Sequence, residues 1–398
     1  MSEKLRVGVV GLGQRGTGLL NDLLLNMPNI EISAVCDVYS DRVDFASGLV
    51  RGSCGKTPFC TTDYREIVLQ RKADCILIET SWKTHTEIAL FCMREKMPVA
   101  TEVGGAGSLK ECFDLVETQE KTGTPFMFLE NCCYGRRELM VLNMVQQNVF
   151  GEIVHCAGGY MHDLRDEISF GRERRHYRLD EYLSHNRENY PTHELGPIAK
   201  ILGINSSNRF VSLTSTSSKA RGLHEYILKE KSDDKVLCGA EFAQGDIVTT
   251  VIRCQNGETI TLTLDTTLPR VYSRGLTVRG TKGMYREDTD SVYLDEMGEH
   301  FNQRKFWGNA SEFAEKYEHD IWKKYIADGV RGSHDGMDYL VYGEFFDCVR
   351  TGRKIPLDVY DAAAWMCITP LSEQSIAAGS APVEIPDFCA KAKEEKLK

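Results

Sequence analysis

Short apolar runs alternate with segments of helical apolar spacing over the first ~130 residues. Runs of strand length occur at Leu5–Val10, Ile30–Cys36, 73–79, 98–102 and 125–129. Between them, apolar side chains recur every three or four residues, the spacing of one helix face, over residues 16–27, 84–96 and 108–122. This alternation predicts an α/β fold that begins with a Rossmann domain, in which a parallel, doubly wound sheet carries helices on both faces.

After about residue 130, strands of period two dominate. Ile260, Leu262 and Leu264 alternate with threonines and follow Asn256-Gly257, a dipeptide typical of a hairpin turn. Further strands are predicted at residues 153–160, 209–214, 247–253 and 276–279, and helices at 136–148, 336–350 and 358–378. We therefore expect a Rossmann domain over residues 1–128, followed by an α+β domain with a mainly antiparallel open sheet over residues 129–398.

A highly charged stretch with little periodicity covers residues 162–189. It is too long for an ordinary linker, and long loops in compact domains are usually functional or disordered. Its charge leaves open whether the chain accepts an acidic or phosphorylated ligand.

Composition narrows the classes of partner. The net charge is −10 and no long basic run occurs, which argues against nucleic acid as a partner. No apolar stretch approaches the roughly 20 residues of a membrane span, and the polar start does not resemble a signal peptide, so we expect no membrane partner and a cytoplasmic location. The 14 cysteines form no CxxC pair, which predicts reduced thiols and no metal site.

A glycine-rich turn links the first strand to the first helix. Gly11, Gly13 and Gly16 fit the spacing GxGxxG, which allows a tight turn, a close phosphate and close packing of helix on strand. The second strand is followed by Asp37, 21 residues after Gly16, where a carboxylate accepts hydrogen bonds from ribose hydroxyls. Because Asp37 would repel the additional phosphate of NADP, NAD is the predicted cofactor. The alternative is a chance glycine-rich turn with a solvated Asp37.

Six segments spread over most of the chain form a more specific pattern. They are EV at 102–103, ENCCY at 130–134, GGYMHDLR at 158–165, NYPTH at 189–193, DTTLPRVYSR at 265–274 and HDGMDY at 334–339. Together with the domain order, they resemble the Gfo/Idh/MocA oxidoreductase family and, within it, glycoside hydrolase family 109, the NAD-dependent α-N-acetylgalactosaminidases.

One departure from the wider family is informative. Its sugar and inositol dehydrogenases usually carry Glu-Lys-Pro after the fourth strand, where the lysine handles the proton of the oxidised hydroxyl. Here the segment is Glu102-Val103-Gly104, and a valine cannot transfer a proton. The departure favours the hydrolase branch over a plain dehydrogenase.

The resemblance also implies site residues. Those at the cofactor would be Gly11, Gly13, Gln14, Arg15, Gly16, Asp37, Trp82, Lys83, Thr84, His85, Glu102, Val103, Asn131 and Tyr190. Those at the sugar would be Glu130, Tyr160, His162, Arg178, Tyr190, Pro191, Thr192, His193 and Tyr272, with His193, Tyr160 and Tyr190 catalytic. The structural alternatives are a helix cap for His85, a helix-start histidine for His193, core packing for Trp82 and Tyr160, and solvated charges for Glu130 and Arg178.

The implied reaction is hydrolysis of a glycoside or amino-sugar substrate by transient oxidation at C3, elimination of the aglycone from C1, addition of water and re-reduction. An NAD-dependent sugar or inositol dehydrogenase is the first alternative, and a catalytically silent protein that senses NAD and sugar is the second. The α+β domain would bind substrate and mediate oligomerisation, because open sheets in this family pair face to face. We therefore expect a homodimer or homotetramer.

Overall fold

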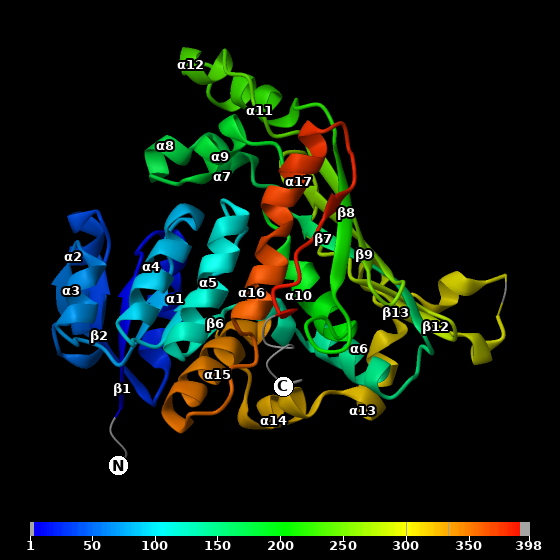
Figure 1. Ribbon diagram of the computed structural model, residues 1–398, viewed down its shortest axis with the longest axis horizontal. Coiled ribbons are helices and arrows are strands. Elements are labelled where there is room, and N and C mark those ends of the chain that lie inside the picture. The colour runs from blue at the N-terminus through cyan, green and yellow to red at the C-terminus, as the bar shows by residue number, and fades with distance from the viewer. Residues whose placement is uncertain (1–3, 300, 333, 391–398) are drawn as a thin grey trace. The chain divides into compact units, whose positions relative to one another are not determined.

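The computed structural model describes residues 4–299, 301–332 and 334–390 (Figure 1). They form two compact units. The first contains the described residues up to Tyr134 together with Gly329–Ala363, and the second contains Gly135–Asp328 and the described residues from Ala364 onward. The return of residues 329–363 to the first unit was not expected, because the spacing of a helix does not tell which sheet it packs on. The domain boundary after residue 128 stays a prediction.

The first unit is built on a six-stranded parallel sheet in the order β3-β2-β1-β4-β5-β6. Its strands are β1 (Leu5–Val10), β2 (Ile30–Cys36), β3 (Phe59–Thr61), β4 (Cys75–Ile78), β5 (Val99–Thr101) and β6 (Phe126–Phe128). The doubly wound sheet is therefore confirmed. The strand order reverses between β1 and β4, and ligands of such sheets bind at the carboxyl ends of the strands at this switch point.

Helices α1 (Gln14–Asp22), α2 (Ser40–Cys54), α3 (Tyr64–Leu69), α4 (Trp82–Arg94) and α5 (Leu109–Thr122), with the 3-10 turn η1 (Leu24–Asn26), connect these strands. The 3-10 turn η2 (Asn131–Tyr134) follows β6, and η7 (His334–Gly336) and α15 (Met337–Thr351) join this unit from later in the chain. Because parallel crossovers are right-handed, α1 and α2 cover one face of the sheet, and α3, α4 and α5 cover the other. The helix expected over residues 16–27 is shorter, since α1 ends at Asp22 and a 3-10 turn follows.

The second unit is built on an eight-stranded sheet in the order β13-β12-β11-β7-β10-β9-β8-β14. Its strands are β7 (Ile153–Met161), β8 (Phe210–Ser217), β9 (Ile247–Cys254), β10 (Thr259–Asp265), β11 (Thr277–Gly280), β12 (Gly283–Arg286), β13 (Ser291–Leu294) and β14 (Val383–Glu384). Only the β7–β10 pair is parallel among these strands, so the mainly antiparallel sheet is confirmed. The predicted hairpin joins β9 and β10, and Gly257 has φ of +104° in its turn.

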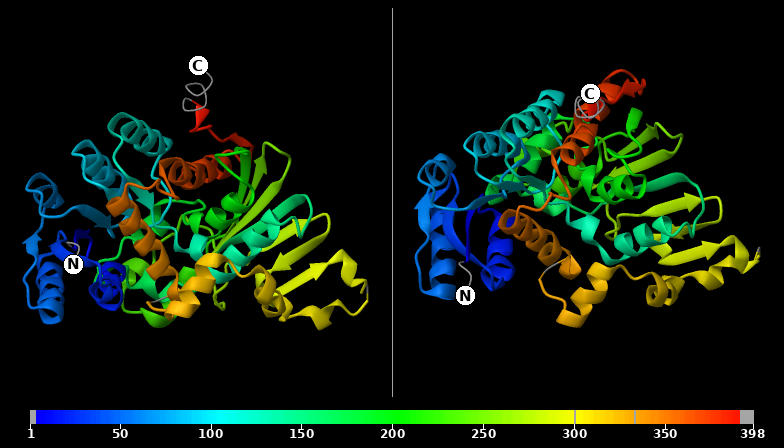
Figure 2. Two further views of the ribbon diagram at one scale, coloured as in Figure 1. Left: turned by 90° about the horizontal axis from the view of Figure 1, so that it is seen from below. Right: turned by 60° about the horizontal axis from the view of Figure 1, so that its bottom comes forward.

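Helices of this unit pack on one face of its sheet, where α10 covers β7 and α17 covers β8 (Figure 2). Thr249, Val251 and Arg253 on β9 point away from these helices and are exposed. At Gly158 on β7, a Cβ would lie 2.0 Å from Cγ of Glu194 on α10, so this glycine permits the close approach of the helix. The helices are α6 (Arg136–Gln146), α7 (Arg165–Ser169), α8 (Gly171–Arg174), α9 (Arg178–Ser184), α10 (Thr192–Ile201), α11 (Gly222–Glu230), α12 (Lys235–Cys238), α13 (Ala314–Tyr317), α14 (Asp320–Asp328), α16 (Val359–Met366, which starts in the first unit) and α17 (Ile368–Ala377).

Two sequence expectations differ from the structure in this unit. The charged stretch 162–189 forms three helices, α7, α8 and α9, which are too short to produce a periodic pattern. The single helix expected over residues 358–378 is divided at Cys367 into α16 and α17. Pro370 explains the break, because it has no N–H to donate to the carbonyl of Met366. Within the part of the chain that the structure describes, no helix combines the length and apolarity needed to cross a membrane.

Candidate active site

Three glycines shape the turn from β1 into α1. Gly11 has φ of +102°, and a Cβ on it would lie 2.5 Å from the carbonyl carbon of Glu79. A Cβ at Gly16 would lie 2.1 Å from the carbonyl oxygen of Gly11, whereas at Gly13 the nearest atom would be 3.6 Å away. The backbone at Gly13 is therefore open to a phosphate, and α1 begins directly after it with N–H groups that have no helical partners. This cradle fits the pyrophosphate of NAD.

Asp37, directly after β2, is buried beside the glycine turn. Its Oδ2 accepts a hydrogen bond from the Leu12 N–H at 2.7 Å, and its Oδ1 accepts one from the Tyr39 N–H at 3.0 Å. A carboxylate offers about four acceptor positions, so Asp37 retains capacity for ribose hydroxyls. Arg42, which the sequence analysis did not single out, lies 3.7 Å from Asp37 in the first turn of α2.

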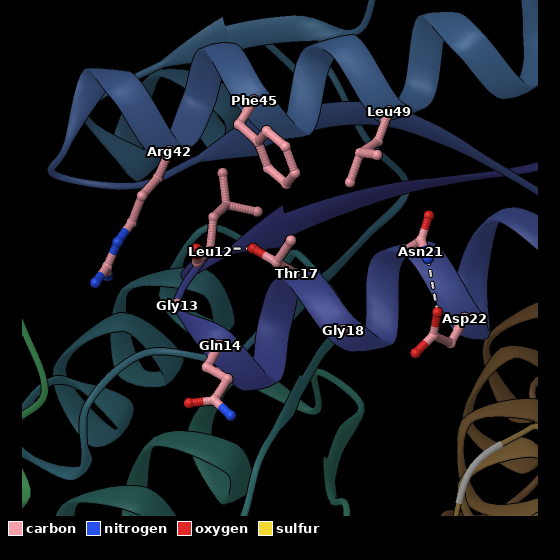
Figure 3. A pocket seen from close by; sticks show the side chains of 10 residues that line it. All are labelled: Leu12, Gly13, Gln14, Thr17, Gly18, Asn21, Asp22, Arg42, Phe45 and Leu49. Carbon is pink, nitrogen blue, oxygen red and sulfur yellow. Dashed lines mark hydrogen bonds between the residues drawn. The ribbon is translucent and has the colours of Figure 1, made fainter. Parts of the chain in front are cut away.

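A groove of about 500 Å³ runs from this turn between α1 and α2 (Figure 3). Gly13 and Arg42 lie at its end near the turn, and Phe45 and Leu49 line it from α2. In the sequence, Arg42 is marked only by its position, five residues after Asp37. A cation at this position can attract a phosphate of the cofactor.

The side chain of Arg15 is bound by acidic residues. Its Nη2 lies 2.8 Å from Oε1 of Glu102, and its Nη1 and Nη2 donate to Asp338 of α15 at 2.9 and 3.0 Å. Asn131 and His334 also contact Asp338, each at 2.8 Å. Although burial opposes ionisation, His334 and Arg15 hold the pKa of Asp338 well below its usual range. This network contains three of the predicted cofactor residues, Arg15, Glu102 and Asn131. Because the guanidinium of Arg15 is bound to carboxylates, the backbone N–H of Arg15 is the group that can bind a phosphate.

A second buried group lies next to this network. The hydroxyl of Tyr342 is 2.7 Å from Oε1 of Glu79 and 3.2 Å from Oε1 of Glu102. Burial and the charge of Glu102 raise the pKa of Glu79 well above its ordinary value. Glu79 therefore holds a proton more tightly than an ordinary glutamate, while Glu102 lies against the guanidinium of Arg15. Neither Glu79, directly after β4, nor Tyr342 on α15 was predicted, because the two segments lie far apart along the chain.

The predicted cofactor residues on α4 have mainly structural contacts. Trp82 packs against Gly104, where a Cβ would lie 2.2 Å from the indole ring. His85 is buried, its Nε2 lies 2.9 Å from the carbonyl oxygen of Thr80, and burial lowers its pKa. The structural alternative of packing agrees with the contacts of Trp82, whereas His85 lies within α4 behind the N-cap Ser81 and contacts a carbonyl oxygen, so it does not cap the helix. The remaining residues differ in exposure: Lys83 is exposed, Thr84 is half-buried, and Val103 and Glu130 are buried.

In the second unit, two tyrosine–histidine pairs form one cluster. The Tyr160 hydroxyl lies 3.1 Å from Nδ1 of His162, and the Tyr190 hydroxyl lies 3.4 Å from Nε2 of His193. The two tyrosine rings are 4.3 Å apart between centroids. Tyr160 and His162 come from β7 and the residue after it, Tyr190 precedes α10, and His193 lies in the first turn of α10. The structure therefore brings these four predicted residues together, and their role in a sugar site stays a prediction.

A largely buried cation adjoins the cluster. Arg178, at the start of α9, lies 5.6 Å from the centroid of the Tyr190 ring, and its guanidinium is paired with Glu167 of α7. Burial alone would lower the pKa of Arg178, but Tyr177, Glu167 and the tyrosine pair raise it well above its ordinary value. Arg178 was predicted from the sequence, but Glu167 was not, because nothing distinguishes it from the other charged residues of the stretch 162–189.

The other predicted sugar residues have distinct positions. Tyr272 is half exposed, and its ring meets His162 edge to face with centroids 5.2 Å apart. Pro191 and Thr192 are buried where α10 begins. The first unit contains Glu130, whose Oε1 accepts a hydrogen bond from the Cys132 N–H at 3.2 Å. Tyr272 therefore contacts the cluster directly. Pro191 and Thr192 form the backbone that connects Tyr190 to His193.

Charges of the stretch 162–189 are largely paired within the second unit. The pairs include Arg174–Asp166 at 2.6 Å, Lys231–Glu173 at 2.7 Å and Arg187–Glu181 at 2.6 Å. The high charge density therefore serves local pairing, and it gives no separate support to an acidic or phosphorylated ligand.

Buried polar contacts fix the segment before Tyr190. The Glu188 N–H donates to Oγ of Ser372 at 2.8 Å, and the Thr369 hydroxyl donates to the Glu188 carbonyl at 2.7 Å. The Glu188 side chain accepts a hydrogen bond from the Tyr190 N–H at 3.3 Å. Burial raises the pKa of Glu188 to about 8. A neutral carboxyl therefore supports the tyrosine at neutral pH.

We expect Glu188→Gln to gain stability relative to wild type as the pH rises from 5 to 8. The unfolded chain loses the Glu188 proton near pH 4.5, whereas the folded chain keeps it to about pH 8, so wild type loses stability across this range. The loss is at most about 4 kcal/mol. Urea unfolding at several pH values measures it, with the exposed Asp180→Asn as control. A difference between Glu188→Gln and wild type that stays constant with pH would contradict the assignment.

Two family models match the sequence, and together they cover most of the chain. The family model described as "Glycosyl hydrolase 109, C-terminal domain" matches residues 134–394. The model described as "Oxidoreductase family, NAD-binding Rossmann fold" matches residues 5–129. The family and the NAD cofactor predicted from the sequence are confirmed.

Similar proteins span nearly the whole chain. A glycosyl hydrolase family 109 protein of Parabacteroides distasonis is 36% identical over 97% of this chain and 87% of its own length. An α-N-acetylgalactosaminidase of Tannerella forsythia is 35% identical over 96% of this chain and 86% of its own length. An inositol dehydrogenase homologue of Azotobacter vinelandii, solved with NAD⁺, shares the fold with a TM-score of 0.70, 15% identity and coverage of 97% and 98%. The chain therefore belongs to glycosyl hydrolase family 109 and is an NAD-dependent glycosidase.

Proposed function

We propose that the chain hydrolyses glycosides of N-acetylgalactosamine, with the α anomer as the first candidate. The observation that carries the chemistry is the pair of phenol–imidazole contacts, Tyr160–His162 and Tyr190–His193. Each contact joins two groups that can exchange a proton. The family 109 relative named α-N-acetylgalactosaminidase supports the choice of sugar.

The first unit would hold the cofactor. The backbone at Gly11, Gly13 and Gly16 would contact the pyrophosphate, Asp37 the adenosine ribose, and Glu102, Val103 and Asn131 the nicotinamide half. Bound NAD supplies a hydride acceptor at C3 of the sugar and later returns the hydride, so the net reaction is hydrolysis.

The second unit would supply the proton transfers. His193 would take the proton of the C3 hydroxyl as the ketone forms, which makes the proton on C2 acidic. Tyr160 or Tyr190 would remove the C2 proton, and the aglycone then leaves C1 with the electron pair of its glycosidic bond. Water adds to C1 of the enone, and the proton returns to C2. The charge of Arg178 would stabilise a phenolate in the tyrosine pair.

Assembly and location are proposed as well. The exposed face of β9, with Thr249 and Val251, supports a homodimer or homotetramer that pairs through the open sheet. The 14 free thiols support a cytoplasmic location. Light scattering after gel filtration measures the assembly directly, and a monomer at micromolar concentration would contradict it.

One assay tests the proposed function. The purified protein is incubated with a panel of p-nitrophenyl glycosides, α-N-acetylgalactosaminide first, and nitrophenol and NADH are followed together with and without added NAD. We expect nitrophenol without accumulating NADH. Stoichiometric NADH from free sugar would identify a dehydrogenase instead, and neither product would leave the sensor alternative.

A further inference from the structure

Tyr160 and His162 form a hydrogen-bonded couple beside the Tyr190–His193 couple, and the Tyr160 ring also meets the His193 ring edge to face, with centroids 5.4 Å apart. Their side chains share one side of β7, because they are two residues apart along an extended chain. The Tyr160 hydroxyl lies 3.1 Å from Nδ1 of His162, and the two rings meet edge to face. His162 is held in turn by its backbone, whose N–H donates to the carbonyl of Asp265 at 2.9 Å. The backbone at His162 is therefore anchored to β10, and the contact with the phenol places Nδ1 at the Tyr160 hydroxyl.

The proposed reaction needs two proton acceptors at the same time. In the oxidised sugar, one proton has left the hydroxyl at C3 and another must leave C2. His193 is assigned to the C3 hydroxyl, and the Tyr190 hydroxyl points to His193 at 3.4 Å. Tyr190 would therefore compete with the C3 proton for the same imidazole. The Tyr160 hydroxyl is hydrogen-bonded to a second imidazole, that of His162, which can accept its proton without drawing on His193.

We propose that His162 is the proton acceptor of Tyr160, and that this couple, rather than Tyr190, removes and returns the C2 proton. The inference rests on the proposed function and assigns a step that it left open. The Tyr160 hydroxyl gives its proton to Nδ1 of His162 while the phenolate oxygen takes the proton from C2. The C2 electron pair then forms the C1–C2 double bond as the aglycone leaves. Each proton returns along the same path when water has added.

The surroundings suit His162 to this role. Burial lowers its pKa, and Arg178 lowers it further, so the imidazole is neutral near pH 7 and can accept a proton. Two carboxylates, Asp163 and Glu167, act in the opposite direction and stabilise the imidazolium once it forms. The groups that face His162 are Tyr160 from β7, Arg178 from α9, Glu167 from α7, Asp163 beside it, His193 from α10 and Tyr272 from the segment before β11.

The test replaces His162 with glutamine, which can keep a hydrogen bond to Tyr160 but cannot take its proton. The matched control is His155→Gln. His155 lies on β7, the strand that ends directly before His162; its Nδ1 is 2.9 Å from the Thr259 hydroxyl, and burial lowers its pKa as well. Both variants receive p-nitrophenyl α-N-acetylgalactosaminide in D₂O. Two rates are read: deuterium entry at C2 by mass spectrometry, and hydride removal from C3 as the transient absorbance at 340 nm.

In His162→Gln, we expect deuterium entry at C2 and nitrophenol release to fall by about 10²-fold or more, while the first hydride transfer is retained. His155→Gln should match wild type in both rates. A His162→Ala protein should regain C2 exchange when imidazole is added, which a purely structural loss would not permit.

The outcomes separate this inference from the proposed function. If wild type shows neither C2 exchange nor a signal at 340 nm, the oxidation–elimination reaction itself is wrong. If wild type shows both and His162→Gln exchanges C2 at the wild-type rate, the reaction stands and the relay is overturned. Equal loss of both rates without imidazole rescue also overturns the relay.

Discussion

Alanine in place of His193 is expected to slow glycoside hydrolysis by about 10²–10⁴-fold, the usual contribution of one positioned acid–base group. His193 lies in the first turn of α10, and its Nε2 is 3.4 Å from the Tyr190 hydroxyl. The affinity for NAD should stay within about twofold, because the residues expected at the pyrophosphate and adenosine ribose lie in the first unit. Initial rates and fluorescence titration with NAD measure the two quantities.

The control for this variant is His224→Gln on α11, which changes a half-buried histidine outside the cluster. It should keep the wild-type rate. Full turnover by His193→Ala would remove His193 from the proposed role at the C3 hydroxyl. Equal loss in both variants would indicate that unspecific damage to the second unit, rather than a lost proton transfer, slows the reaction.

Alanine in place of Gly16 is expected to weaken NAD binding by at least about 100-fold, which is about 2.7 kcal/mol of binding free energy. The new Cβ would lie 2.1 Å from the carbonyl oxygen of Gly11, so α1 must move away from the phosphate turn. Calorimetric titration with NAD measures the loss. Wild-type affinity in Gly16→Ala would show that the turn does not hold the phosphates.

Gly48→Ala on α2 is the matched control, because a Cβ at Gly48 meets nothing within 4 Å. In an exposed helix this change stabilises by roughly 0.5–1 kcal/mol. Its NAD affinity should equal that of wild type. Comparison of the two alanine variants therefore separates the steric conflict at Gly16 from any general effect of removing a glycine.

Local patterns predicted much of the first unit. Leu5–Val10 and Ile30–Cys36 were identified to the residue, because apolar runs of strand length bounded by turn residues define β1 and β2. The return of α15 to this unit was not predictable. Asp338 and Tyr342 join Arg15, Glu79 and Glu102 only in three dimensions, and no spacing along the chain records that contact.

The same distinction applies to the second unit. Tyr160 and His162 are two residues apart on a strand, so their pairing follows from strand geometry. Glu167 and Glu188 were not predicted, because the partner of each comes from a separate helix. Glu167 pairs with Arg178, and the backbone N–H of Glu188 donates to Ser372. Sequence reasoning therefore located residues with chemical signatures and overlooked those that hold them in place.

The central claim is that hydrolysis proceeds through transient oxidation at C3 and removal of the C2 proton. The most direct measurement compares turnover of p-nitrophenyl α-N-acetylgalactosaminide with deuterium at C2, with deuterium at C3 and without label, and then analyses the product formed in D₂O. We predict slower turnover for at least one labelled substrate and solvent deuterium at C2 of the released sugar. Equal rates for all three substrates, with no solvent deuterium at C2, would instead establish direct displacement at C1.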